Sequence, residues 1–229
     1  MKLPKLIIQT RELIHLSASV SIATLVPACV PRPQLVLPAY ISFTVMDKQE
    51  EDYWCWAAVA VGISRHHNGG SSQHTQCSLA TAFSNGLNCC NNGSDTDCNK
   101  SRDLAIALGS PYGTGNLLAK RGPLPFVEVA EHISMKCHPL PCRIGYETDD
   151  GHAVVICGAY IKDSKEFLCI KDPDDPYGEV GILYSDFPKK YKHAGQWTNT
   201  YITHGGGNIG NTGGNRWLLF FRHILKRFI

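Results

Sequence analysis

Cys55 lies at the start of a long apolar stretch, residues 54–64, which reads WCWAAVAVGIS. The repeated alanines favour a buried helix over a strand, and Asp52 is expected to cap its start. A thiol attacks a carbonyl group only as thiolate, and the unpaired N–H groups of a helix N-terminus stabilise negative charge. The pattern therefore predicts Cys55 as a nucleophile, against the alternative of an inert cysteine in a buried helix.

Gln49 lies six residues before Cys55 (55 − 49 = 6). Attack on a carbonyl group produces an oxyanion, which N–H donors must stabilise. The backbone N–H at the helix start supplies one donor, and a side-chain amide from just upstream can supply another. We therefore expect Gln49 in an oxyanion hole.

His152 and Asp172 are the residues expected to activate the thiol. His152 follows Gly151 at the start of an apolar strand, and Asp172 follows the next predicted strand, twenty residues later (172 − 152 = 20). Two strands joined by a hairpin bring these opposite ends together, so a carboxylate can orient the imidazole base. The alternatives are a strand-end histidine without function, a turn-forming Asp-Pro, and Asp174 or Asp175 in the orienting role.

Ten cysteines are many for 229 residues, and most of them cluster. Clustered cysteines predict disulfides, which persist in oxidising compartments. The clusters are Cys77, Cys89, Cys90 and Cys98, and then Cys137 and Cys142. A zinc site is the alternative for the first cluster, with His66, His67 or His74 as further ligands, but its only close pair is adjacent, whereas zinc ligands are usually spaced. The sequence predicts neither a metal nor a cofactor.

Charge and hydropathy exclude some classes of partner. The net charge is only +2, from 22 basic and 20 acidic residues, so no nucleic-acid surface is expected. Arg222, Lys226 and Arg227 are expected to form a solvated tail. Beyond the N-terminal segment, no stretch approaches the ~20 apolar residues of a membrane-spanning helix.

The first 37 residues are predicted to be an N-terminal extension. Basic residues precede an apolar stretch at 16–30, as in a signal peptide, and residues 25–29 (LVPAC) resemble a lipoprotein cleavage site. A buried N-terminal strand or a misassigned start is the alternative. Residues 38–229 are expected to form one catalytic domain, with a glycine-rich loop at 204–214.

Helices are predicted first along the chain and strands second, which indicates an α+β domain. The expected helices are 54–64, 73–83, 101–108 and 124–133. The expected strands are 40–45, 143–146, 152–160, 166–171, 180–184, 197–203 and 217–221.

Several blocks in this order resemble the bacterial papain-like cysteine proteases related to plant-pathogen avirulence effectors. The blocks are QEEDYWCWAA at 49–58, TQCSLA at 75–80, the Cys89-Cys90 pair, GHAVVICG at 151–158 and KDP at 171–173. The resemblance covers roughly residues 40 to 190. It implies a papain-like fold, in which an N-terminal helical part with the catalytic helix packs on a C-terminal antiparallel sheet.

The resemblance also implies peptide-bond cleavage by Cys55, His152 and Asp172, with Gln49 at the oxyanion hole. The chain departs from plant and lysosomal papains before the cysteine, where Tyr53-Trp54 replaces Gly-Ser. The cysteine-to-histidine spacing is shorter, and an aspartate replaces the asparagine. These departures leave the substrate preference open.

The expected function is that of a cysteine peptidase, exported as an effector or toxin, with a protein or peptide substrate and an inhibitor or immunity protein as partner. The same residues can perform deamidation, isopeptide cleavage or acyl transfer, because all pass through a thioester. A non-catalytic binding module that keeps the fold is a further alternative. We expect a secreted or cell-envelope location, with the cytoplasm as the alternative.

Overall fold

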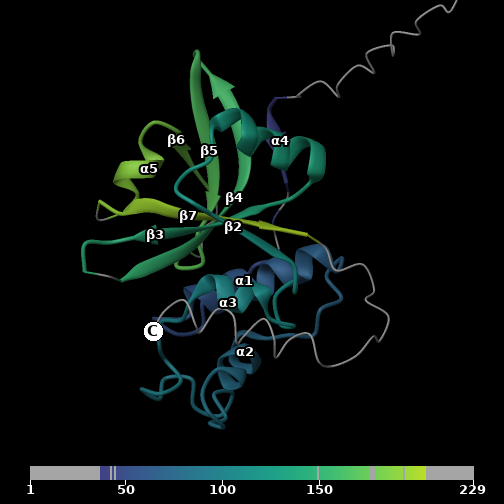
Figure 1. Cartoon of the computed structure of the whole chain (residues 1–229), viewed down its shortest axis with the longest axis vertical. Helices are drawn as coiled ribbons and strands as arrows, with labels where there is room; N and C mark the ends of the chain where they lie inside the picture. The colour runs from purple at the N-terminus through teal and green to yellow at the C-terminus, as the bar shows by residue number, and fades with distance from the viewer. Residues whose placement is uncertain are drawn as a thin grey trace, which may run out of the picture. The chain divides into compact units, whose positions relative to one another are not determined.

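An antiparallel sheet of seven strands forms the centre of the computed structural model (Figure 1). The structure describes residues 37–204 except 42, 44, 149, 176–178 and 193. Six strands follow the order β2-β7-β3-β4-β5-β6, and β1 pairs with β4 beside this path. The strands are β1 (Ala39–Tyr40), β2 (Leu117–Arg121), β3 (Leu140–Gly145), β4 (Gly151–Lys162), β5 (Lys165–Lys171), β6 (Glu179–Leu183) and β7 (Gln196–Thr203).

Helices cover both faces of β4. They are α1 (Cys55–His67), α2 (Gln76–Ala82), α3 (Leu104–Gly109), α4 (Phe126–Lys136) and α5 (Phe187–Lys190). Val155 and Cys157 lie in a core shared with α1 to α3, whereas Val154 and Ile156 lie in a second core with α4 and α5. Successive side chains of a strand point to opposite faces, and both faces of β4 are buried. Apolar residues therefore follow one another along the middle of β4.

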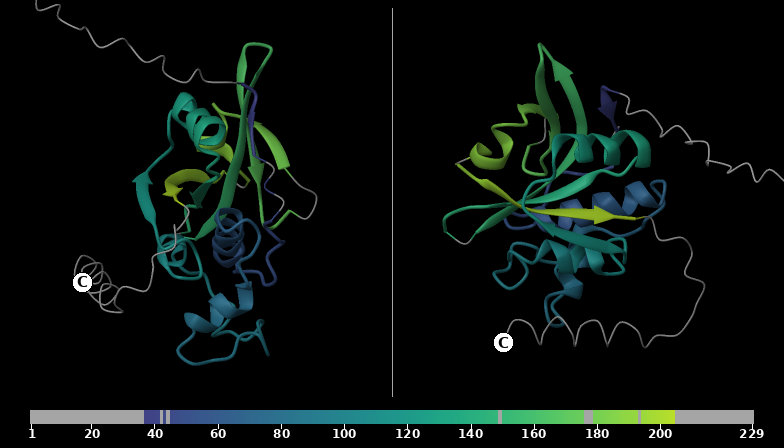
Figure 2. Two further views of the ribbon diagram at one scale, coloured as in Figure 1. Left: turned by 90° about the vertical axis from the view of Figure 1, so that its right-hand side faces the viewer. Right: turned by 45° about the horizontal axis from the view of Figure 1, so that its top comes forward.

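The α+β class, with the helix of Cys55 packed on the antiparallel sheet, is confirmed. Figure 2 shows α2 and the loop after it projecting away from the sheet. The described residues belong to one compact unit. Among them, no helix combines the length and apolar character that a bilayer span requires.

The four predicted helices exist, but their ends differ from the expectation. α2 begins at Gln76, three residues late, because Thr75 and Ser78 exchange side-chain-to-backbone hydrogen bonds in a capping box. α3 begins at Leu104, because the Asp103 carboxylate accepts hydrogen bonds from the backbone N–H groups of Ala105 and Ile106.

The strand predicted at residues 40–45 is wrong for the described residues beyond Tyr40, since Ile41, Phe43 and Val45 do not belong to a strand. Ile41 still donates its N–H to the Cys157 carbonyl at 2.8 Å, but the ladder ends there. Phe43 and Met46 instead pack in the core beside α1, where Met46 lies against Gly62. The apolar alternation of this segment thus reports packing on a helix rather than strand pairing.

The five strands predicted between residues 143 and 203 are confirmed, with ends shifted by at most three residues. β2 and α5 were not predicted, because LLAKR lacks alternation and α5 has only four residues. The strand at 217–221, the basic tail, the glycine-rich loop beyond His204 and the N-terminal extension before Leu37 lie outside the described residues.

His132 of α4 makes the stability of this fold sensitive to acid. Its side chain is 3% exposed, and its Nδ1 has no hydrogen-bond partner among the described residues. Burial, followed by the charge of Lys136, lowers the pKa of His132 from 6.5 to about 4. The folded state therefore resists a proton that the unfolded chain accepts, so this contribution is complete above pH 6.5 and is lost as the pH falls towards 4.

We predict that His132→Gln reduces this acid sensitivity. Between pH 7 and pH 5, the free energy of unfolding of the natural chain should fall by about 1 to 2 kcal/mol more than that of the variant. Urea unfolding at the two pH values measures both. Equal falls in the two proteins would contradict the prediction.

Candidate active site

Cys55 is the first residue of α1, and its side chain is almost buried, with 8% exposed. Trp54 precedes it without a side-chain cap. No carbonyl of the described part of the chain accepts a hydrogen bond from the backbone N–H of Cys55 or Trp56. The helix start therefore presents two free donors, which can stabilise a thiolate or an oxyanion.

The prediction that Asp52 caps α1 is wrong. A capping side chain belongs to the residue directly before the first helical one, and that residue is Trp54. Asp52 lies two residues further upstream, with its side chain exposed. Its carbonyl oxygen instead accepts a hydrogen bond from the Gln49 amide at 2.8 Å.

A loop held by disulfides positions the start of α1. Trp54 donates its indole N–H to the Cys98 carbonyl at 2.9 Å, and Trp56 donates to the Lys100 carbonyl at 3.0 Å. The Tyr53 backbone N–H donates to the Asn99 side chain at 3.0 Å. Three residues around the helix start, Tyr53, Trp54 and Trp56, thus bind three consecutive residues of one loop.

Two disulfides form within the first cysteine cluster, as predicted. They join Cys77 to Cys90 and Cys89 to Cys98. All four sulfurs are therefore engaged, which excludes the zinc alternative for this cluster. Among the described residues, no group of three His, Cys, Asp or Glu side chains could hold a metal ion.

The prediction of a disulfide in the second cluster is wrong, because Cys137 and Cys142 are both free. Cys142 is buried in the middle of β3, whereas Cys137 is exposed at the left-handed C-terminal end of α4, with φ at 52°. Their different surroundings explain why nearness in sequence does not produce a bond.

His152 and Asp172 meet at one end of the β4–β5 hairpin, as expected from the sequence. His152 is the second residue of β4, and Asp172 directly follows β5. The ring Nε2 of His152 lies 2.6 Å from Oδ1 of Asp172, whose side chain is fully buried. The carboxylate that contacts the His152 ring is thus that of Asp172 and not that of Asp174. Asp174 instead donates its backbone N–H to the same Oδ1 at 2.9 Å.

The surroundings of His152 favour its protonated form. Burial alone disfavours the charge, but the hydrogen bond to Asp172 and the nearby Cys55 side chain outweigh it and raise the pKa of His152 to about 9. Burial likewise opposes ionisation of Asp172, yet the hydrogen bond to His152 keeps the pKa of that carboxyl well below its usual value. Nε2 is engaged by Asp172, so Nδ1 is the ring nitrogen left for the Cys55 thiol.

Tyr191 and Lys192 also bind Asp172, and neither was predicted from the sequence. The Tyr191 hydroxyl donates to Oδ2 of Asp172 at 2.6 Å, and Nζ of Lys192 lies 2.8 Å from the same oxygen. Both residues directly follow α5, whose four residues are too few to produce a recognisable helical pattern in the sequence. No signal in the chain points from this region to the site.

Gln49 lies beside the site, but its amide is engaged with the backbone. Its Nε2 donates to the carbonyls of Glu51 at 3.1 Å and Asp52 at 2.8 Å, and its buried Oε1 has no partner among the described residues. The Gln49 backbone N–H donates to the Pro173 carbonyl at 2.8 Å. The segment before α1 is thereby joined directly to the turn that carries Asp172.

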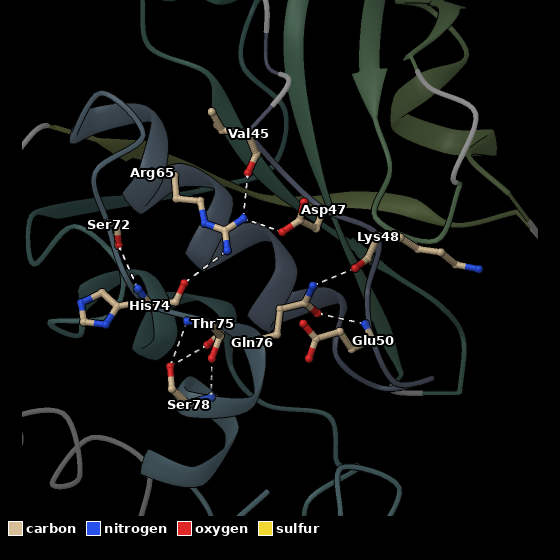
Figure 3. A network of polar contacts seen from close by, with 10 residues as sticks. All are labelled: Val45, Asp47, Lys48, Glu50, Arg65, Ser72, His74, Thr75, Gln76 and Ser78. Atoms are coloured by element: carbon tan, nitrogen blue, oxygen red, sulfur yellow. Dashed lines mark hydrogen bonds and ion pairs between the residues drawn. The ribbon is translucent and has the colours of Figure 1, made fainter. Parts of the chain in front are cut away.

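Gln76 is a buried residue that supports the segment leading to Gln49 (Figure 3). Its amide donates to the Lys48 carbonyl at 2.7 Å and accepts from the Glu50 N–H at 3.1 Å. The residue belongs to the TQCSLA block, but its role could not be predicted from that block. Its two backbone contacts enclose Gln49 on both sides along the chain.

Arg65 of α1 supports the same segment from the other side (Figure 3). Its guanidinium donates to the Val45 carbonyl at 3.4 Å and lies 2.5 Å from the Asp47 carboxylate. A further bond reaches the His74 carbonyl at 3.4 Å, just before α2. Figure 3 shows Arg65 and Gln76 reaching this segment from two different helices.

Two hollows in the surface meet at Cys55 and His152. One is also lined by Tyr146, Asp174 and Lys192, and the other by Arg102 and Arg143. The thiol and the imidazole are therefore accessible from a cleft that extends to both sides of them. A chain-like substrate could lie across the pair in such a cleft.

No protein-family model matches the chain, and no curated protein matches it. The chain is similar to the solved structure of the digestive procathepsin L 3 of Tenebrio molitor larval midgut, at 10% identity and a TM-score of 0.48, over 76% of this chain and 71% of that one. It is also similar to a structure from a study of the mite allergens Blo t 1 and Der p 1, at 13% identity and a TM-score of 0.42, over 76% and 73% of the two chains. Both likenesses are distant.

We predict that the Cys89–Cys98 disulfide keeps the Cys55 thiol in its reactive position. Replacing both cysteines by serine should lower the free energy of unfolding by about 2 to 4 kcal/mol and slow the alkylation of Cys55 by iodoacetamide. As the matched control, serines at Cys77 and Cys90 remove the other bridge, which does not carry the carbonyl that binds Trp54. If both double variants alkylate at the natural rate while folded, the prediction fails.

We further predict that His152 governs the reactivity of Cys55 over a wide pH range. With its pKa raised to about 9, the imidazolium persists beside the thiol up to about pH 9. His152→Ala should therefore slow the alkylation of Cys55 at pH 6 at least about tenfold. Peptide mapping by mass spectrometry measures Cys55 and the exposed Cys137 in one sample, so Cys137 provides the internal reference.

Proposed function

We propose that the chain is a papain-like cysteine peptidase that hydrolyses peptide bonds through a Cys-His-Asp triad. The observation that carries this proposal is the position of the His152 ring, which binds the buried Asp172 carboxylate and lines the same two hollows as Cys55. A cysteine at a helix start, a histidine and an orienting carboxylate are the parts that thiol-based acyl transfer requires.

The chemistry follows from these positions. The Cys55 thiolate attacks the carbonyl carbon of the substrate, and the His152 imidazolium donates its proton to the departing amine. The product is a thioester on Cys55. Neutral His152 then removes a proton from water, which attacks the thioester and releases the acid. Asp172 keeps the ring in one orientation throughout both steps.

The oxyanion of each tetrahedral intermediate requires donors near the helix start. The free N–H groups of Cys55 and Trp56 support this role. Gln49 would contribute its side-chain amide by releasing the carbonyl of Glu51 or Asp52. Gln49 thus remains our candidate for the oxyanion hole, with a rearrangement of its amide as part of the role.

We also propose that the protein is exported and acts as an effector or toxin, consistent with the bacterial blocks that it resembles. Two disulfides within one loop region support an oxidising location. A protein of this kind needs a partner that restrains it in the producing cell, which is the reason to expect an inhibitor or immunity protein.

Cys55→Ala tests the proposed activity. The natural protein, incubated with a proteome, should create new N-termini, and Cys55→Ala should reduce their rate of formation by about 10³-fold or more. Cys137→Ala is the matched control, because this exposed thiol lies outside the site, and it should leave the rate unchanged. Labelling of N-termini followed by mass spectrometry provides the measurement.

Other outcomes of that experiment identify the alternatives. Conversion of glutamine to glutamate without new N-termini would overturn the peptidase in favour of a deamidase. Release of side-chain-linked proteins or transfer of an acyl group would indicate an isopeptidase or an acyltransferase. If an epoxide inhibitor labels Cys55 no faster than Cys137, the chain is a non-catalytic binding module.

A further inference from the structure

The two oxygens of the Asp172 carboxylate bind different groups. Oδ1 accepts from His152 Nε2 at 2.6 Å and from the Asp174 N–H at 2.9 Å. Oδ2 accepts from the Tyr191 hydroxyl at 2.6 Å and lies 2.8 Å from the Lys192 ammonium. The side chain is fully buried, so these four donors replace the water that an ionised group would otherwise bind.

Lys192 adds a positive charge to this arrangement. The charged or titratable groups nearest the His152–Asp172 pair are Cys55 of α1, Tyr146 after β3, Asp174 and Asp175 beyond Asp172, and Tyr191 and Lys192 after α5. Further charged groups line the hollows that His152 borders, namely Asp52, Arg102, Asp103, Arg143 and Asp150. Lys192 and His152 are the cations that form ion pairs with Asp172 in the described part of the chain. Charges therefore alternate in sign along the line from the Cys55 thiolate through His152 and Asp172 to Lys192.

The backbone around Lys192 is constrained in a way that brings the ammonium to Asp172. Tyr191 and Gly195 form an isolated antiparallel bridge, with hydrogen bonds of 3.1 and 2.7 Å between their backbones. Within this tight loop, Lys192 has φ at 27°, a conformation that non-glycine residues rarely adopt. A Cβ at Gly195 would lie 2.4 Å from Ile144, so the loop can close only with glycine there.

Tyr191 holds the other side of this loop. Its side chain is 4% exposed and packs edge-on against Phe187, with ring centroids 5.2 Å apart. Burial and the nearby Asp172 charge raise the pKa of its hydroxyl, so Tyr191 stays a neutral donor. Tyr191 can therefore orient the carboxylate but cannot offset its charge, whereas Lys192 can do both.

We propose that Lys192 is a positioning residue that orients the Asp172 carboxylate towards His152 and reduces the negative charge which that imidazole experiences. This inference rests on the proposed function, since it concerns the activation of the same thiol. Lys192 acts through Asp172 and does not itself enter the reaction. Its side chain is 38% exposed at the edge of the cleft, where solvent moderates its effect without removing it.

Loss of the Lys192 charge should move the titration of the site to higher pH. Removing a positive charge favours the protonated imidazole and disfavours the thiolate, because each then experiences a more negative surrounding. In Lys192→Met, the alkaline limb of kcat/KM should therefore move to higher pH by about 0.5 to 1 unit, and so should the midpoint of Cys55 alkylation. A purely structural role would lower the rates without moving either midpoint.

Three variants test the inference. Lys192→Arg keeps the charge and should retain both midpoints, whereas Lys192→Met should shift both. Lys190→Met is the matched control, because this nearby lysine is 72% exposed and lies 3.7 Å from Asp186, away from the site. It should behave as the natural chain does. Profiles of Lys192→Met that coincide with those of Lys190→Met would overturn the inference.

Alkylation by iodoacetamide separates this inference from the proposed function, because it needs no substrate. If Cys55 of the natural protein reacts no faster than Cys137 at pH 6, the proposed activity fails. If Cys55 reacts fast and Lys192→Met leaves its midpoint in place, only the role of Lys192 fails. If the midpoint moves as expected and no peptide is cleaved, the role of Lys192 stands and the peptidase does not.

Discussion

A buried carboxylate, Asp172, is the constraint on which the rest of the site depends. An ionised group without water is stable only when donors occupy its lone pairs, and Asp172 obtains them from β4, from its own turn and from the loop after α5. Each donor comes from a segment that the sheet must bring into register. The position of His152 is therefore a consequence of the β4–β5 pairing and of the loop at Tyr191, not of local sequence.

The other half of the site depends on how the start of α1 is held. Trp54 and Trp56 are buried, and their indole groups bind the carbonyls around the Cys89–Cys98 disulfide. The segment before the helix is bonded by Gln76 and by the Pro173 carbonyl next to Asp172. The thiol and the imidazole are thus fixed from two directions, although α1 itself lacks a side-chain cap.

The elements that the sequence predicted well share a physical property. α1 and β4 are continuously apolar, and burial on both faces leaves such runs little alternative to the core. Elements with weaker signals were missed or misread. β2 lies at the sheet edge with mostly exposed side chains, and Phe43 and Met46, in and after the alternating segment, pack in the core of α1 instead of continuing a strand. Periodicity reports which residues are buried, but not what covers them.

The sequence by itself determined the α+β class and the meeting of His152 with Asp172, because strong local signals define the strands that these two residues adjoin. Only the tertiary structure decided the remaining partners. Tyr191 and Lys192 reach Asp172 from a short irregular segment, the amide of Gln49 is turned to nearby carbonyls, and Cys137 and Cys142 remain apart. Contacts of this kind depend on where distant segments lie in space, and neither residue type nor spacing encodes that position.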